Sequence, residues 1–125
     1  MARFMLLLHS AAAEREQWRN FTPEQMQQAM QHYYDWVAQL RGEGRMLSGD
    51  PLKDDGIILR MRDGEAVVDG PFAETKESVG GYFLIEARDL AEAAEVAKGC
   101  PALRHNGWVE VREIDEGEGE GANDQ

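Results

Sequence analysis

The sequence predicts a single α+β domain in which short strands and two helices share one core. Its 125 residues are 42% hydrophobic, enough to build one core rather than two. Phe4–Leu8 is apolar throughout, as in a strand buried on both faces, and Tyr82–Glu86 is a second run with strand character. Between them, apolar residues recur at helical spacing after Thr22. Strands and helices therefore alternate along the chain.

The first strand and a long helix are predicted in the N-terminal third. The apolar run Phe4–Leu8 ends at the polar pair His9-Ser10, and residues 11–21 predict only a loose helical turn. Thr22 is a suitable helix cap, Pro23 suits the first helical position, and Gln25 can reach back to the cap. The stripe of this predicted helix, which stops at Gly42 and Gly44, consists of Met26, Met30, Tyr33, Val37 and Leu40.

The middle of the chain predicts a β-hairpin. Arg45–Gly49 is a short strand candidate, followed by loop residues from Asp50 to Gly56. Ile57–Arg62 and Glu65–Val68 flank Asp63-Gly64, a strong two-residue hairpin signal. The segment 69–77 is expected to interrupt the strands.

The C-terminal third predicts a strand, a helix and a strand. After Tyr82–Glu86, the tetrad Asp89–Glu92 reads as a capping box, and the helix should end near Gly99 and Pro101. A last strand is expected over Trp108–Ile114, so the domain should span residues 1–114, followed by an acidic disordered tail over 115–125. The sheet-facing side of the helix is expected to consist of Leu90, Ala93, Ala94 and Ala97.

This order is close to a βαββαβ plan, which predicts a ferredoxin-like sheet with helices on one face and an extra strand in the middle. Two helices cover only one face of such a sheet. The first strand and the strand at Tyr82–Glu86 are apolar on both sides. We therefore expect two copies to pack sheet against sheet as a homodimer.

Composition excludes several classes of protein. A formal net charge of -11 opposes binding along a nucleic-acid backbone. No apolar run approaches the ~20 residues that cross a bilayer, so no membrane association and a cytoplasmic location are expected. The single cysteine, Cys100, permits no intramolecular disulfide, and the three histidines lack metal-ligand spacing. Neither a metal nor another cofactor is expected.

The segment Asp69–Glu77, with Gly80-Gly81-Tyr82 after it, resembles the DGPF signature that names a branch of the YCII-related family. The similarity in kind and order of elements covers residues 1–114. The resemblance implies a dimeric α+β barrel of the ferredoxin-like class. It also implies an association with extracytoplasmic-function sigma factors, beside which DGPF proteins are often encoded.

The sequence departs from the active-site pattern of the wider family, in which some relatives are thought to act on lactones or chlorinated hydroxyquinones. Those relatives carry a histidine near the start of the first long helix, where this chain has Gln25, and an Asp-Pro where this chain has Cys100-Pro101. Their His–Asp pair is therefore not carried over.

His9 and Asp69 are the candidate catalytic residues. His9 closes the first strand and could act as a general base, with Asp69 orienting it if the two strand ends converge. The alternative is that Asp69 caps its own turn. His32 and His105 are interpreted as surface residues.

The candidate ligand-binding residues surround a cleft near the DGPF turn. Their alternatives are structural: packing for the two aromatic residues, turn formation for the glycine and proline, and a solvated ion pair for the lysine. Whether the chain is an enzyme stays open between a small-molecule-binding or catalytic protein and a non-catalytic module that regulates a sigma factor. The candidate ligand-binding residues are Tyr34, Gly70, Pro71, Phe72 and Lys76.

Overall fold

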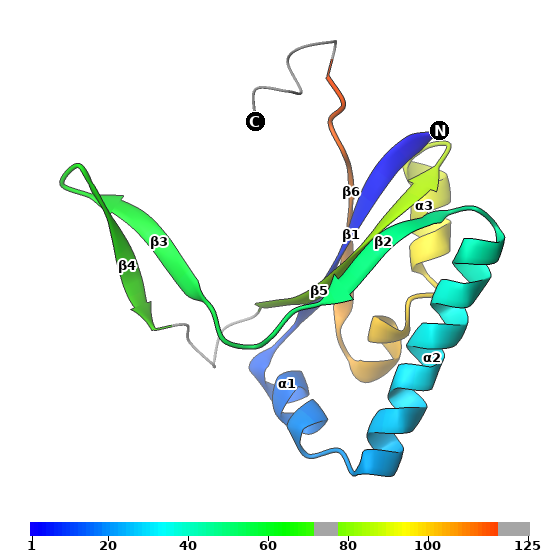
Figure 1. The fold of residues 1–125 in the computed structure, drawn as a ribbon, viewed down its shortest axis with the longest axis horizontal. Helices are drawn as coiled ribbons and strands as arrows, with labels where there is room; N and C mark the ends of the chain where they lie inside the picture. Colours follow the sequence, from blue (N-terminus) through cyan, green and yellow to red (C-terminus); the bar gives the residue numbers. More distant parts are fainter. Residues whose placement is uncertain (72–77, 118–125) are drawn as a thin grey trace.

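A computed structural model of the chain describes residues 1–71 and 78–117. Four strands form an antiparallel sheet in the order β2-β5-β1-β6 (Figure 1). With the separate β3–β4 hairpin set aside, this order is compatible with a ferredoxin-like βαββαβ domain. The sheet strands are β1 (Ala2–Ser10), β2 (Met46–Pro51), β5 (Ser78–Ala87) and β6 (Trp108–Glu113), and the hairpin strands are β3 (Ile57–Arg62) and β4 (Glu65–Pro71).

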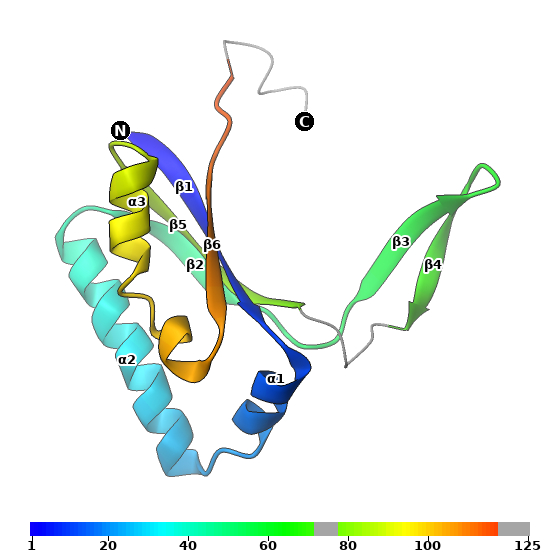
Figure 2. The ribbon, with the colours of Figure 1, turned by 180° about the vertical axis from the view of Figure 1, so that it is seen from behind.

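The helices lie on one side of the sheet, as predicted (Figure 2). They are α1 (Ala12–Arg19), α2 (Pro23–Gly42) and α3 (Leu90–Ala97), with a 3-10 helix, η1 (Pro101–His105). The predicted capping box is confirmed at α2, where the Thr22 hydroxyl accepts from the Gln25 backbone N–H at 3.1 Å. The Gln25 side chain in turn accepts from the Thr22 backbone N–H at 2.9 Å. These reciprocal bonds satisfy two donors at the helix start and fix where α2 begins.

The core lies between α2, α3 and the sheet. Phe4 and Leu6 of β1 and Ile85 of β5 are fully buried on the helix side, and Trp36 and Leu40 of α2 cover them. Because strand residues alternate between faces, Met5, Leu7 and Leu84 must point to the other face. No helix of the described chain covers that face.

The β3–β4 hairpin projects away from the sheet (Figure 1). Its turn residues Asp63 and Gly64 have φ of 51° and 84°, as the hairpin signal predicted. The strand register places four large apolar side chains on one side of the hairpin, and each is between 54% and 67% exposed. They are Ile57, Leu59, Met61 and Val68.

Several local predictions need correction. Residues 12–19 form a regular helix rather than a loose turn, and Asp69–Pro71 continues β4 instead of interrupting the strands. Leu90 is 54% exposed, so the sheet-facing side of α3 rests on Ala93 and Ala97. At the cap of α3, Asp89 accepts from the Glu92 backbone N–H, but the Glu92 carboxylate accepts from Arg88 rather than from Asp89.

The predicted tail begins where the described chain is still in contact with the sheet. Arg3 Nε donates to Glu116 Oε1 at 2.7 Å, and the second carboxylate oxygen accepts from the same guanidinium. Residues 118–125 lie outside the described residues. Within the described part of the chain, we find no helix with the length and apolar character needed to cross a membrane.

Candidate functional site

An apolar cavity of about 780 Å³ lies between α1, α2, η1 and the neighbouring ends of β1, β2 and β5. Its size falls in the range typical of small-molecule sites, ~300–1,000 Å³. Trp36 and Leu40 of α2 pack into the core, whereas other residues along the same helix, from Met26 to Arg41, line the cavity. The apolar wall side chains include Trp18, Met26, Met30, Tyr33, Val37 and Phe83.

Tyr33 gives this wall a polar group that stays neutral. Its ring stacks near that of Phe83, with centroids 6.4 Å apart. Burial raises the pKa of the Tyr33 phenol well above its ordinary value, and Cys100 adds to the effect. The Tyr33 hydroxyl is therefore available as a hydrogen-bond donor across the physiological pH range.

Arg15 brings a buried charge to the end of the cavity beside β1. The side chain is 7% exposed, and its Nη1 donates to the Ser10 carbonyl oxygen at 3.1 Å. Because a charged group is costly to remove from water, a buried arginine marks a place where negative charge or strong acceptors are favourable.

His105 lies next to this end of the cavity. Its ring packs against Trp18 at 4.8 Å and Phe21 at 6.1 Å between centroids. Its Nε2 is buried and has no hydrogen-bond partner among the described residues. The interpretation of His105 as a surface residue was therefore wrong.

The protonation state of His105 follows from its surroundings. Burial lowers its pKa below the ordinary value, and the charges of His32 and Arg104 add to that effect. The imidazole is therefore neutral near pH 7, so that one ring nitrogen donates and the other accepts.

The rim of the cavity carries polar groups from α1, α2, β2, β5 and the loop after β2. Tyr34 lines the cavity but is 63% exposed, as befits a rim position. The Tyr82 hydroxyl donates to Asp50 Oδ2 at 3.1 Å, and this bond raises the pKa of Tyr82. Arg19 and Asp54 form a longer ion pair of 3.5 Å across the opening.

The structure does not bring the two predicted catalytic residues together within one chain. His9 Nε2 lies 2.9 Å from Glu110 Oε1, and its ring stacks on Trp108. Asp69 accepts instead from Arg60 Nε at 2.6 Å and from an Arg62 nitrogen at 2.9 Å. His9 is on the main sheet and Asp69 is on the hairpin.

The remaining predicted site residues divide into two groups. Gly70 and Pro71 end β4 on the hairpin. Phe72 and Lys76 lie outside the described residues. Tyr34 is found in the wall of the cavity.

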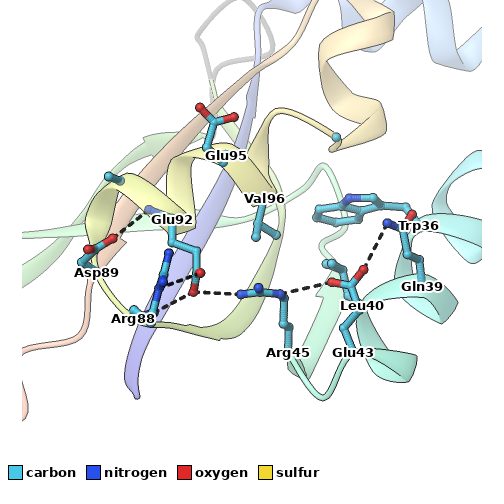
Figure 3. A pocket seen from close by; sticks show the side chains of 12 residues that line it. Trp36, Gln39, Leu40, Glu43, Arg45, Arg88, Asp89, Glu92, Glu95 and Val96 are labelled. Carbon is cyan, nitrogen blue, oxygen red and sulfur yellow. Dashed lines mark hydrogen bonds and ion pairs between the residues drawn. The ribbon is translucent and has the colours of Figure 1, made fainter.

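A second pocket of about 610 Å³ lies between α2 and α3, and its two arginines form ion pairs with two of the carboxylates in its wall (Figure 3). Arg45 donates to Glu43 at 3.1 Å and to Glu92 at 3.0 Å, and Arg88 pairs with the other oxygen of Glu92. Hydrogen bonds from Arg45 and the Arg88 backbone lower the pKa of Glu92. This network joins the end of α2 to the start of α3, and we therefore assign it a structural role.

The described residues form neither a metal-ligand cluster nor a reactive thiol site. No group of three potential metal-ligating side chains occurs in residues 1–71 and 78–117. Cys100 is buried in the core, and burial raises the pKa of its thiol to about 11. The thiolate that nucleophilic chemistry requires is therefore scarce at neutral pH.

The sequence pattern does not identify the residues that define the cavity end, namely Arg15, Trp18 and His105. Because residues 11–21 predict only a loose helical turn, no helix face can be assigned to Arg15 and Trp18. The spacing of Arg15, Trp18 and Arg19, three and four residues apart, is the helical signal that could have identified this wall.

Comparison with known proteins identifies the family of this chain. The model of the YCII-related domain matches residues 2–117. An uncharacterized protein of Rhizobium meliloti (strain 1021) is 51% identical over 58 residues, which are 45% of this chain and 47% of that protein. The match therefore spans about half the length of this curated relative.

Proposed function

The chain belongs to the YCII-related family, and from this membership and the cavity we propose that it binds a small, largely apolar molecule between α1, α2 and the sheet. The observation that carries the proposal is a cavity of about 780 Å³ whose walls are apolar except for a few fixed polar groups. Small-molecule sites combine these two properties, because apolar contact supplies affinity and a few polar groups supply orientation.

A thermal-shift screen against a metabolite library tests this proposal. A ligand at 100 times its dissociation constant adds ~2.7 kcal/mol to the free energy of unfolding. We expect ligands that stabilise the parent protein to lose their effect in Met30→Arg, which places a charged side chain in the cavity wall. Lys98→Met, an exposed change on α3, is the matched control. Ligands that stabilise parent and Met30→Arg equally would place the site elsewhere.

We also propose that the protein is a homodimer formed through the open face of the sheet. Met5, Leu7 and Leu84 lie on this face without a covering element in the described chain. A two-fold axis through the face would cover the same patch on both copies.

Light scattering with size exclusion tests the dimer. The parent should have twice the mass of the chain, 14.1 kDa, and Leu7→Arg should be monomeric because it places a charge in the apolar patch. Leu90→Arg, on an exposed part of α3, should remain dimeric. A parent that elutes as a monomer at micromolar concentrations contradicts the proposal.

Catalysis by His9 with Asp69 is a separate proposal, and it requires the two side chains to meet between subunits because each has another partner within the chain. A crystal structure of the dimer would decide it from the distance between the two side chains. The role as a sigma-factor regulator rests on the family resemblance alone. Recovery of a sigma factor with the purified protein at low salt is the measurement that would favour it.

A further inference from the structure

The β3–β4 hairpin has one apolar side. Leu59 pairs with Val68, and Met61 pairs with Ala66, across the two strands. Paired side chains lie on the same side of a sheet, and Ile57 lies two residues before Leu59, so all five lie together. Each of the five is exposed, and none carries a charge. We call these five residues the hairpin strip.

The hairpin itself does not cover this strip. Its ion pairs lie on the opposite side, where Asp69 accepts from Arg60 at 2.6 Å and from Arg62 at 2.9 Å. β3 packs on β4, and neither strand makes comparable contact with another helix or strand in residues 1–71 and 78–117. A hairpin of two strands is marginally stable in water unless its apolar side is covered. The hairpin strip therefore requires a surface from outside the hairpin.

The hairpin lies on the side of the sheet that α2 and α3 leave open (Figures 1 and 2). Met5, Leu7 and Leu84 point to this side of the sheet, by the alternation of β1 and β5. Trp108 points the same way, because it pairs with His9 and its ring stacks on the imidazole. A protein that covers these residues therefore lies beside the hairpin as well.

The open face of the sheet is small for an interface of its own. Strand alternation gives four strands of this length roughly a dozen side chains on one face. A stable protein–protein interface takes about 20–30 residues from each partner. The hairpin strip is an exposed apolar surface on the same side, and its five residues extend the face toward the required size.

Charge favours a second copy of the chain as the occupant of the hairpin strip. The protein has a formal net charge of -11, so two copies repel one another at long range. Their contact is favourable where both surfaces are apolar and uncharged, as the hairpin strip and the residues around Leu7 are. A basic partner is recognised through carboxylates, and the hairpin strip contains none.

We propose, as an inference that rests on the proposed homodimer, that the β3–β4 hairpin is a dimerisation arm. Each copy places its hairpin strip against the open side of its partner, so the two arms are given and received reciprocally. The contact supplies the stability that an isolated hairpin lacks. The arm is thus ordered by the partner, whereas the four-stranded sheet is ordered by its own core.

Dissociation of the full-length dimer tests the contribution of the arm. Sedimentation velocity over a dilution series should show a dissociation constant about a hundredfold higher in the double variant Leu59→Gln, Met61→Gln than in the parent. The matched control is Leu90→Gln with Leu103→Gln, two leucines outside the hairpin that are also exposed. This control should keep the dissociation constant of the parent.

Hydrogen exchange tests the arm without altering it. Amides of residues 57–68 should be protected in the parent dimer and should exchange at least about tenfold faster in the monomeric Leu7→Arg variant. Amides of Phe83–Ile85 in the sheet should stay protected in both proteins, which reports that the domain remains folded. Unchanged protection of residues 57–68 in the monomer would overturn the dependence of the arm on its partner.

Salt separates an apolar contact between like-charged copies from an electrostatic one. Raising NaCl from about 50 to 500 mM screens the repulsion between two acidic copies, so the parent dimer should become tighter. A dimer that weakens over this range would overturn the apolar arm in favour of contacts between opposite charges.

The outcomes also separate this inference from the proposed homodimer. A parent dimer whose dissociation constant is unchanged in Leu59→Gln, Met61→Gln would overturn the arm and leave a dimer through the sheet face alone. A parent that is monomeric throughout the dilution series would overturn both proposals. A weakened dimer in the double variant, with the control unchanged, supports both.

Discussion

The four-stranded sheet with its helices and the β3–β4 hairpin belong to the same chain, but they expose their apolar residues differently. In the sheet, Phe4, Leu6 and Ile85 are fully buried. In the hairpin, Leu59 and Met61 are more than 60% exposed, and the ion pairs of Asp69 occupy the opposite side. The comparison indicates that the sheet and helices supply most of the free energy of unfolding. The exposed apolar side chains of the hairpin are available for contacts outside the hairpin.

The largest expected effect contrasts two leucines. Leu6→Ala should lower the free energy of unfolding by about 2–5 kcal/mol, because it leaves a cavity in a closed core. Leu59→Ala, on the exposed side of the hairpin, should change it by less than about 0.5 kcal/mol. Urea denaturation in the monomeric Leu7→Arg background measures both. Equal losses would mean that the hairpin shares the core.

A smaller effect is expected at the start of α2. Thr22→Ala removes the hydroxyl that accepts from Gln25, which should cost about 1 kcal/mol of unfolding free energy. Thr22→Ser keeps that oxygen and should restore most of the loss. The same urea titrations measure both variants, and a silent Thr22→Ala would show that α2 does not depend on its cap.

His105 should make the free energy of unfolding decrease at acid pH. Its pKa in the folded protein is lowered, chiefly by burial, so the unfolded chain binds the proton more readily. Stability from this residue is therefore full above the unfolded pKa of about 6.5 and is lost as pH falls toward the folded pKa.

In His105→Gln, the unfolding free energy should fall less between pH 7 and pH 5 than in the parent. Urea titrations at several pH values within this window measure the difference. Parallel pH profiles for the two proteins would contradict a buried, neutral His105.

The smallest effect is expected at Asp69, despite its place in the DGPF signature. Asp69→Asn removes the charge that pairs with Arg60 and Arg62, both more than half exposed. Such pairs contribute about 0–1 kcal/mol, so the unfolding free energy should change by less than about 1 kcal/mol. A loss comparable to that of Leu6→Ala would show that the hairpin is not energetically separate.

Local signals predicted much of the fold. The capping tetrad at Thr22 set the start of α2, and Asp63-Gly64 set the hairpin turn, because both signals act through backbone hydrogen bonds or φ values of a few adjacent residues. The resemblance to the YCII-related family was confirmed over residues 2–117.

The candidate site was harder to predict because it depends on tertiary distances. His9 and Asp69 both end strands, but they end strands of different sheets, and neither local pattern contains that information. His105 lies in a polar-looking segment, and its Nε2 is buried because Trp18 of α1 and Phe21 of the loop after α1 pack around its ring. Tyr34 lines the cavity, since a position beside the helical stripe lies at the edge of what the helix covers.

The connection of the hairpin to the sheet has a further consequence. The chain leaves β2 after Pro51 and returns in β5, which first pairs with β2 at Gly81, opposite Pro51. Beside this point the Leu52 backbone N–H donates to the Gly80 carbonyl oxygen at 2.9 Å. Because the points of departure and return are neighbours, the intervening segment can lengthen or shorten without changing the register of β2 and β5. Natural variation or protein engineering could therefore replace the segment between β2 and β5 with another peptide without changing the four-stranded sheet.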